Sequence, residues 1–253
     1  MLEVERLSKY FGEVKAVHDL SFSVRNGEVF GLLGPNGAGK TTTIKTIIGL
    51  IDPTDGRVRV DGINVIEQPL EVKKRIGYVP ENCALYENLT AREYLQLVGN
   101  LHHLPEEKIS SQIEKLMANL DLTDAIDRRM TGYSKGMKQK ILLTSALLHN
   151  PALIILDEPF SGLDSNSAAV FKQLITQLSE SGKTVIFSSH VLEVVEKLCE
   201  RLVIIHEGMK LAEGDVTEIM AQAGETSLDK AFSRLTGVTN IKDRANDIID
   251  ALE

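Results

Sequence analysis

The sequence predicts an α/β protein built on a parallel β-sheet, with antiparallel strands ahead of it and a helical block inserted into it. The main observation is a set of short, continuous apolar runs of the kind that form strands buried on both faces. They occur at residues 29–33, 153–156, 185–188 and 202–205. The second observation is the helical periodicity between the last three runs, and the third is a longer helical stretch at residues 85–148.

The composition is that of an ordinary folded protein. Its 253 residues, 43% hydrophobic and 25% charged, suffice for a sizeable core and exclude a disordered or fibrous chain. No apolar run approaches the roughly 20 residues of a membrane-spanning helix. Glu3 and Glu5 stand where a signal peptide would begin with basic residues, so we expect the protein in the cytoplasm. The net charge of -8 argues against a nucleic acid partner.

Alternation and turn residues define the elements of the first part of the chain. Apolar and polar positions alternate at residues 2–4 and 20–24, which predicts antiparallel strands. The strand at residues 29–33 runs through a glycine-rich loop into an apolar-periodic helix. Residues 57–65 predict a hairpin with Asp61-Gly62 as its turn.

Helical periodicity governs residues 85–148 and returns after the later strands. Thr90 and Glu93 form a capping-box pattern ahead of the first helix of this block. Further helices are expected around residues 109–120, 141–148, 165–181 and 191–199 and, beyond Gly214, up to a last amphipathic segment at residues 241–252. We therefore expect three parts: a nucleotide-binding core with the antiparallel strands (residues 1–84 and 149–215), an inserted helical subdomain (85–148) and a helical extension (216–253).

The strongest chemical signal is GPNGAGKT at residues 34–41, which matches the phosphate-binding loop pattern in full between a strand and a helix. Glycines let the loop's N–H groups point inward, and the helix N-terminus adds positive charge. Lys40 is expected to reach the β- and γ-phosphates, Thr41 to offer a hydroxyl to Mg²⁺, and Thr42 to add a phosphate contact. The remaining loop residues expected at the nucleotide are Gly34, Pro35, Asn36, Gly37, Ala38 and Gly39. A glycine-rich turn that only opens a helix is the alternative, and the complete match favours the phosphate site.

The second signal is an acidic pair, Asp157 and Glu158, at the end of the apolar run at residues 153–156. Adjacent side chains at a strand end point in different directions. Asp157 can therefore reach the Mg²⁺ shell while Glu158 addresses an attacking water. Taken alone, such a pair is as often the polar start of a loop, and the phosphate loop upstream favours the functional interpretation.

Three further segments identify a family. GYSKGMKQ at residues 132–139 (the signature segment) precedes the acidic strand, Ser161-Gly162-Leu163-Asp164 follows it, and Ser188-Ser189-His190 follows the next strand. In order and spacing the chain resembles the ATP-binding cassette family, the motor subunits of ABC transporters, over about residues 1–215. The resemblance implies a P-loop NTPase core with an antiparallel β subdomain and an inserted α-helical subdomain.

The resemblance also implies roles for individual residues. Ser134 and Gly136 of the signature segment would bind the γ-phosphate held by the opposite subunit, and Asp164 would join the nucleotide contacts. His190 would bond to the γ-phosphate, as the family's switch histidine does, although a histidine after a buried strand is most often structural. Phe11 would stack on adenine, with Tyr10 as the rival partner.

Two departures from the family pattern point to one branch. The signature segment has Tyr-Ser-Lys-Gly-Met where the family usually has Leu-Ser-Gly-Gly-Gln, and Glu81 occupies the usual place of a glutamine. Both changes are similar to the branch that powers drug and polysaccharide exporters, as is the short tail motif at residues 227–237. A carboxylate at position 81 is a harder Mg²⁺ ligand than an amide but brings negative charge toward the γ-phosphate.

The resulting hypothesis is an ATPase that uses ATP and Mg²⁺ and acts as a dimer, with a second copy or a homologous subunit, on the inner face of the cell membrane. It would drive a separate integral-membrane permease docked near residues 81–88. One alternative is a soluble, non-transport cassette ATPase, and another is a regulatory module that binds ATP without hydrolysing it. The sequence leaves open the substrate, the direction of transport and the permease.

Overall fold

The computed structural model describes residues 1–161, 163 and 165–237 and contains two β-sheets. The smaller sheet has the order β2-β1-β4-β5 and consists of β1 (Leu2–Phe11), β2 (Val14–Val24), β4 (Asp55–Val60) and β5 (Ile63–Asn64). β1 pairs antiparallel with both β2 and β4. The β4–β5 pair confirms the hairpin expected around Asp61-Gly62.

The larger sheet has six strands in the order β10-β9-β3-β8-β7-β6. They are β3 (Val29–Leu33), β6 (Ile76–Val79), β7 (Leu153–Leu156), β8 (Thr184–Ser189), β9 (Arg201–His206) and β10 (Met209–Asp215). The five strands from β9 to β6 are parallel, and β10 pairs antiparallel with β9. The α/β class and the parallel sheet are therefore as predicted.

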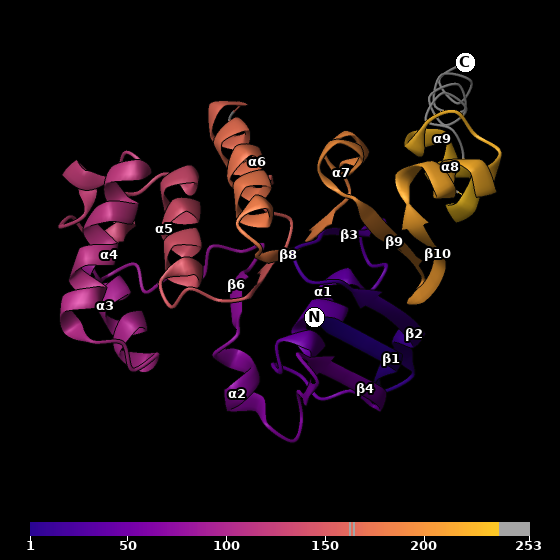
Figure 1. Ribbon diagram of the computed structural model, residues 1–253, viewed down its shortest axis with the longest axis horizontal. Coiled ribbons are helices and arrows are strands. Elements are labelled where there is room, and N and C mark those ends of the chain that lie inside the picture. The colour runs from indigo at the N-terminus through magenta and orange to yellow at the C-terminus, as the bar shows by residue number, and fades with distance from the viewer. Residues whose placement is uncertain (162, 164, 238–253) are drawn as a thin grey trace, which may run out of the picture.

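Helices cover the larger sheet and form a block beside it (Figure 1). They are α1 (Lys40–Ile47), α2 (Pro69–Lys73), α3 (Ala91–Leu101), α4 (Glu106–Asn119), α5 (Lys135–Leu147), α6 (Ser165–Glu180), α7 (Leu192–Leu198), α8 (Val216–Ala223) and α9 (Leu228–Thr236), with 3₁₀ turns at Thr123–Ala125 and Met130–Gly132. Figure 1 shows α3, α4 and α5 at one end of the molecule and α8 and α9 at the other. Among the described residues, no helix is long and apolar enough to cross a membrane.

Three apolar clusters form the core. Alternate residues of the larger sheet belong to different clusters: Leu32 packs with the smaller sheet and α1, and Leu33 with the helices on the opposite face. The third cluster lies within residues 91–148. α5 joins the second and third clusters, because Leu142 contributes to one and Ile141 to the other. Both faces of the parallel sheet are thus buried, as its continuous apolar strands require.

Local signals explain several boundaries. The capping box is confirmed, since the Glu93 N–H donates to Thr90 Oγ1 at 3.1 Å and the Thr90 N–H donates to Glu93 Oε2 at 2.8 Å. Two elements were not predicted. β10 is an edge strand in which only Ala212 and Gly214 are buried, so it lacks hydrophobic alternation, and α2 has only 5 residues, too few for a helical period. The amphipathic segment expected at residues 241–252 lies outside the described residues.

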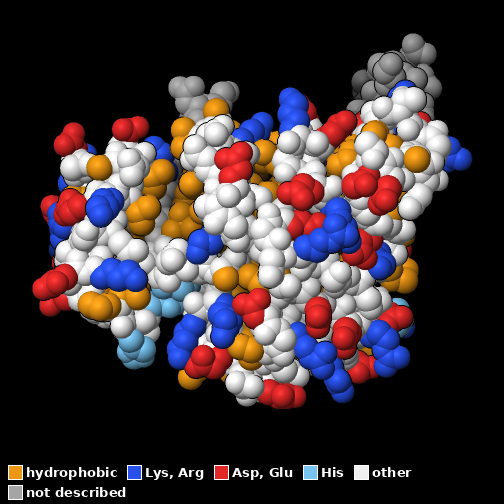
Figure 2. All heavy atoms as spheres, viewed as in Figure 1, with side chains coloured by type: hydrophobic (Ala, Val, Ile, Leu, Met, Phe, Trp, Pro, Cys, Tyr) orange, Lys and Arg blue, Asp and Glu red, His pale blue; other side chains and the backbone are white. Residues whose placement is uncertain are grey.

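The surface carries mixed charge and one apolar groove on the face shown in Figure 2, where acidic and basic side chains are interspersed. Hydrophobic side chains gather there between α5 and α6. They belong to a groove whose apolar lining includes Leu116, Leu120, Leu143, Leu147, Val170 and Leu174. The groove lies away from the phosphate loop and takes no part in the site described next.

Candidate active site

The phosphate loop connects the end of β3 to the start of α1, as predicted from the sequence. Gly37 and Gly39 adopt left-handed φ values of 81° and 104°, which side chains other than glycine rarely accept. A Cβ on Gly39 would lie 2.5 Å from the Ala16 carbonyl oxygen, and one on Gly34 would lie 2.3 Å from that of Ile205. Glycines are therefore required here both by conformation and by the close approach of neighbouring backbone.

Two backbone hydrogen bonds hold this loop against distant parts of the chain, through the turn between β9 and β10. The Gly208 N–H donates to the Ala38 carbonyl at 3.0 Å, and the His18 N–H donates to the Gly208 carbonyl at 2.8 Å. The loop, β2 and the β9–β10 turn are consequently fixed to one another.

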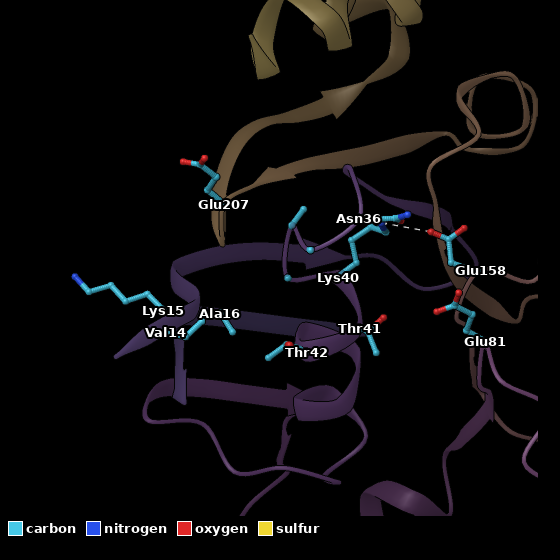
Figure 3. Close-up of a pocket in the computed structure, with 13 residues that line it drawn as sticks. Val14, Lys15, Ala16, Asn36, Lys40, Thr41, Thr42, Glu81, Glu158 and Glu207 are labelled. Carbon is cyan, nitrogen blue, oxygen red and sulfur yellow. Dashed lines mark ion pairs between the residues drawn. The ribbon is translucent and has the colours of Figure 1, made fainter. Parts of the chain in front are cut away.

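These three segments and the ends of β6 and β7 surround a pocket of about 460 Å³. Its described lining is Val14, Lys15, Ala16, Asn36, Gly37, Ala38, Gly39, Lys40, Thr41, Thr42, Glu81, Glu158 and Glu207. Figure 3 shows Glu158 and Glu81 at one end and Lys15 and Glu207 at the other, with Lys40 between them. The pocket is elongated from a phosphate-binding end to a second end with exposed polar side chains.

Lys40 is the buried cation of the pocket, with only 6% of its surface exposed. Its ammonium donates to the carbonyls of Gly34 at 2.8 Å and Pro35 at 3.2 Å. Its Nζ also lies 3.4 Å from Glu158 Oε1, the ion pair drawn as a dashed line in Figure 3. The loop thus places a charged donor where the sequence predicts phosphate.

Glu158 and His190 form a second contact at the same end. His190 Nδ1 lies 2.9 Å from Glu158 Oε2, so the two carboxylate oxygens of Glu158 face His190 and Lys40 respectively. Glu158 is 8% exposed and has a left-handed φ of 48°, which is uncommon for a residue with a side chain. The structure therefore brings together all three residues predicted to be catalytic.

Asp157 and Thr41, two of the three predicted metal ligands, also meet. Thr41 Oγ1 donates to Asp157 Oδ1 at 3.4 Å, and Asp157 is 1% exposed. Asp157 Oδ2 is buried without a hydrogen-bond partner among the described residues. Thr41 and the third, Glu81, line the pocket, whose described lining does not include Asp157. Burial raises the pKa of Tyr78 well above its usual range, and the charges of Asp157 and Glu81 raise it further, which places both carboxylates near one ring.

This donor set fits Mg²⁺. Mg²⁺ takes oxygen ligands only, and it is commonly held by one or two carboxylates together with substrate phosphates and water. The unpartnered Asp157 Oδ2 is the buried oxygen that such an ion would use. Within the described ranges, no group of three or more His, Cys, Asp or Glu side chains is arranged to hold a metal ion.

The signature segment lies apart from this pocket. Ser134 is exposed and caps α5, because its Oγ accepts the Met137 N–H at 3.2 Å, and Gly136 is half-buried. Neither residue belongs to the described lining of the pocket around Lys40. Asp164 lies outside the described residues.

The two candidate stacking residues also stand apart from the described lining of the pocket. Phe11 is 51% exposed, with Lys9 Nζ 5.1 Å from its ring centroid, and the Tyr10 hydroxyl is within hydrogen-bonding distance of His18 Nδ1 at 2.7 Å. The pocket wall opposite Glu158 and Glu81 is instead formed by residues 14–16 and Glu207. Sequence reasoning missed this wall because no local motif marks it; only the fixed position of the β9–β10 turn brings Glu207 to the pocket.

Comparisons with known proteins agree with this geometry. Residues 17–161 match the family described as ABC transporter. The chain is 41% identical to the ABC transporter ATP-binding protein NatA of Bacillus subtilis, covering 87% of this chain and 89% of NatA. It is 34% identical to the daunorubicin resistance ATP-binding protein DrrA3 of Streptomyces coeruleorubidus, covering 96% and 81% respectively.

Solved structures give the same result. An ATP-binding subunit of an ABC transporter superposes with a TM-score of 0.88 at 35% identity, covering 93% of this chain and 99% of the other. A dimeric ATP-binding cassette in a post-hydrolysis state, bound to ADP and Pi, superposes with a TM-score of 0.79 at 26% identity, covering 85% and 98%.

Proposed function

The chain belongs to the ABC transporter family as an ATP-hydrolysing subunit, and from that premise we propose which residues carry the reaction and which partners complete it. The observation that carries the proposal is the arrangement around Glu158. Its two carboxylate oxygens face Lys40 and His190, at the end of the phosphate loop. Lys40 and Glu158 line the pocket, and His190, which is outside its described lining, contacts Glu158.

The chemistry follows from these positions. When ATP binds, the Lys40 ammonium leaves the Gly34 and Pro35 carbonyls and binds the β- and γ-phosphates. The loop N–H groups and the N-terminus of α1 also bind phosphate oxygens. Release of Lys40 frees one oxygen of Glu158 to accept a hydrogen bond from the attacking water. His190, held beside Glu158, donates to the γ-phosphate. The catalytic residues are therefore Lys40, Glu158 and His190.

Thr41, Asp157 and Glu81 would hold Mg²⁺. The ion supplies charge neutralisation of the phosphates when bound. Thr41 contributes its hydroxyl and Asp157 its free Oδ2, and Glu81 contributes a carboxylate where the family usually has an amide. We propose that Phe11, which is outside the described lining of the pocket, stacks on adenine, and that Thr42, which lines the pocket, adds a phosphate contact.

A second subunit completes the site. Ser134 and Gly136 stand at the exposed N-terminus of α5, away from Lys40, so in one chain they have no nucleotide to bind. Placed against the pocket of a second copy or of a homologous subunit, this helix end would bind its γ-phosphate. Asp164 is proposed to contribute at the same junction. ATP thereby joins two subunits, and hydrolysis releases them.

The other partner is an integral-membrane permease, which would place the protein in the cytoplasm at the inner face of the membrane. We propose that it docks on a groove lined by Leu85, Tyr86, Glu87, Asn88, Leu89 and Leu97. Tyr86 is 68% exposed there, and the groove overlaps the expected residues 81–88. The separate apolar cluster within residues 91–148 supports a division between the core and the helical subdomain (85–148), and the extension from residue 216 stays part of the proposal. The named relatives favour transport over a non-transport ATPase, and resemblance to DrrA3 favours export.

The test is a conservative change of Glu158. Glu158→Gln keeps the shape and removes the basic carboxylate, so ATP hydrolysis should slow by about 10²-fold or more while ATP binding is retained. Glu207→Gln is the matched control, since it removes a carboxylate from the far end of the same pocket (Figure 3). Wild-type hydrolysis by Glu158→Gln would refute the assignment of the base.

The same variant tests assembly. Without nucleotide, Glu158→Gln should be monomeric. With ATP it should shift toward a dimer, because the bound ATP is not hydrolysed; light scattering after size exclusion measures both states. Adding Ser134→Arg places a bulky guanidinium at the junction and should block that shift. A Glu158→Gln/Ser134→Arg protein that still dimerises with ATP would contradict the role of the signature segment.

A further inference from the structure

We infer that Ser188 is a positioning residue that fixes both members of the acidic pair; this inference rests on the proposed roles of Asp157 and Glu158. Ser188 belongs to β8, which pairs in parallel with β7 in a register that sets Leu156 opposite Phe187. One residue further on, Ser188 lies beside Asp157, two residues before His190. The sheet register therefore brings this hydroxyl to the acidic pair.

The hydroxyl makes two hydrogen bonds, one to each acidic residue. Ser188 Oγ donates to Asp157 Oδ1 at 2.6 Å and accepts the Glu158 N–H at 2.9 Å. Ser188 is fully buried, at 0% exposure. A hydroxyl has one donor hydrogen, and here that hydrogen is used on a carboxylate, which makes the bond charge-assisted and strong.

The bond to Asp157 assigns its two oxygens to different tasks. Oδ1 is occupied by Ser188 and Thr41, and Oδ2 has no hydrogen-bond partner among the residues that the structure describes. If the Ser188 hydroxyl were absent, the carboxylate could rotate about its last side-chain bond, because that torsion is broad. Ser188 thus holds the carboxylate in one orientation, in which Oδ2 is the oxygen left free for a ligand.

The hydrogen bond from the Glu158 N–H fixes the backbone of Glu158. Glu158 has a left-handed φ of 48°, a conformation that persists only where surrounding contacts hold it. Anchoring its N–H fixes the backbone from which the side chain extends to Lys40 and His190. One buried hydroxyl therefore couples the metal-binding and water-polarising carboxylates.

A matched control is available in the same strand. Thr184 is also in β8 and is 1% exposed, but its hydroxyl accepts the Gly27 N–H at 3.0 Å, at the strand end remote from the acidic pair. Thr184→Val removes a buried β8 hydroxyl without touching Asp157 or Glu158. Thr184→Val therefore shows how much activity changes when a buried β8 hydroxyl is lost away from the acidic pair.

The experiment compares Ser188→Ala, Ser188→Cys and Ser188→Thr with Thr184→Val in steady-state hydrolysis. Ser188→Ala and Ser188→Cys should lower kcat about tenfold, equivalent to about 1.4 kcal/mol of barrier, with KM for ATP changed less than about twofold. Ser188→Thr keeps the hydroxyl and should recover most of kcat if it folds; the Ala and Cys variants decide the result if it does not.

A second measurement is independent of turnover. The ratio of ATP dissociation constants in EDTA and in Mg²⁺ reports how well the metal ligands are arranged, and it should fall in Ser188→Ala but not in Thr184→Val. Equal kcat and equal ratios in Ser188→Ala and Thr184→Val would overturn the positioning role. If Glu158→Gln is slow in that case, the proposed function stands and only this inference falls; if Glu158→Gln hydrolyses normally, the proposed function itself is wrong.

Discussion

The buried pair of Lys40 and Glu158 should stabilise the nucleotide-free fold as well as serve catalysis. The two charged atoms are 3.4 Å apart, with side chains 6% and 9% exposed. At an effective dielectric constant of about 20, their Coulomb attraction is about 5 kcal/mol, of which desolvation cancels part. Lys40→Met leaves Glu158 Oε1 buried without its cation, so we expect a loss of about 3 kcal/mol in the free energy of unfolding.

A double-mutant cycle isolates the pair. Glu158→Gln should lower the free energy of unfolding less than Lys40→Met does, because glutamine can still hydrogen bond to His190. Lys40→Met/Glu158→Gln should be more stable than the sum of the single changes by about 2 kcal/mol, because neither charge is left alone.

Thermal unfolding without nucleotide is the assay. For a chain of this size, 1 kcal/mol corresponds to about 2–4 °C in Tm, so Lys40→Met should lower Tm by about 6–12 °C. Lys197→Met, which removes the cation of the exposed pair with Glu193, should leave Tm unchanged because solvent screens that pair. Strict additivity of the two single changes would refute the reasoning.

Three further predictions concern the metal, pH and packing. Glu81→Gln should bind ATP but raise the Mg²⁺ concentration for half-maximal hydrolysis, as a titration would show; an unchanged value leaves Glu81 outside the metal shell. Burial, and secondarily the charge of His102, lowers the pKa of His149 to about 4 from its ordinary 6.5, so the folded state binds fewer protons than the unfolded chain in that window. The contribution of neutral His149 to stability is present above pH 6.5 and is lost as pH falls toward 4, so His149→Phe should flatten the decline of Tm between these two pH values. Gly77→Ala would set a Cβ 2.3 Å from the Ala146 carbonyl oxygen, so it should lower Tm by several degrees, and a wild-type Tm would contradict the close packing of β6 on α5.

The phosphate-binding end of the site could be predicted because its information is local. The segment at residues 34–41 carries strand, loop and helix signals in sequence, and Asp157 and Glu158 follow directly from a buried strand. Their convergence needs only the rule that parallel strands end at the same edge of a sheet. His190 required the family resemblance, since a lone histidine after a strand has no chemical meaning by itself.

The opposite end of the pocket could not be predicted, because long-range packing creates it. Residues 14–16 belong to a strand of the smaller sheet, and Glu207 belongs to a turn of the larger one. Neither segment has a motif, and the hydrogen bonds of Gly208 help to hold them together. Ser188 belongs to the segment Ser188-Ser189-His190, but its role depends on the register of β7 and β8, which the sequence does not state. β10 was missed because an edge strand with two buried residues has no apolar pattern.

The hydrogen bonds of Gly208 also affect when, during synthesis of the chain, the nucleotide pocket can form. The phosphate loop is made early in synthesis, but the turn that braces it against His18 and Ala38 comes after β9. A nascent chain that stops short of this turn has the loop without its support, so ATP has no complete pocket to stabilise. Nucleotide can therefore stabilise only the nearly finished fold.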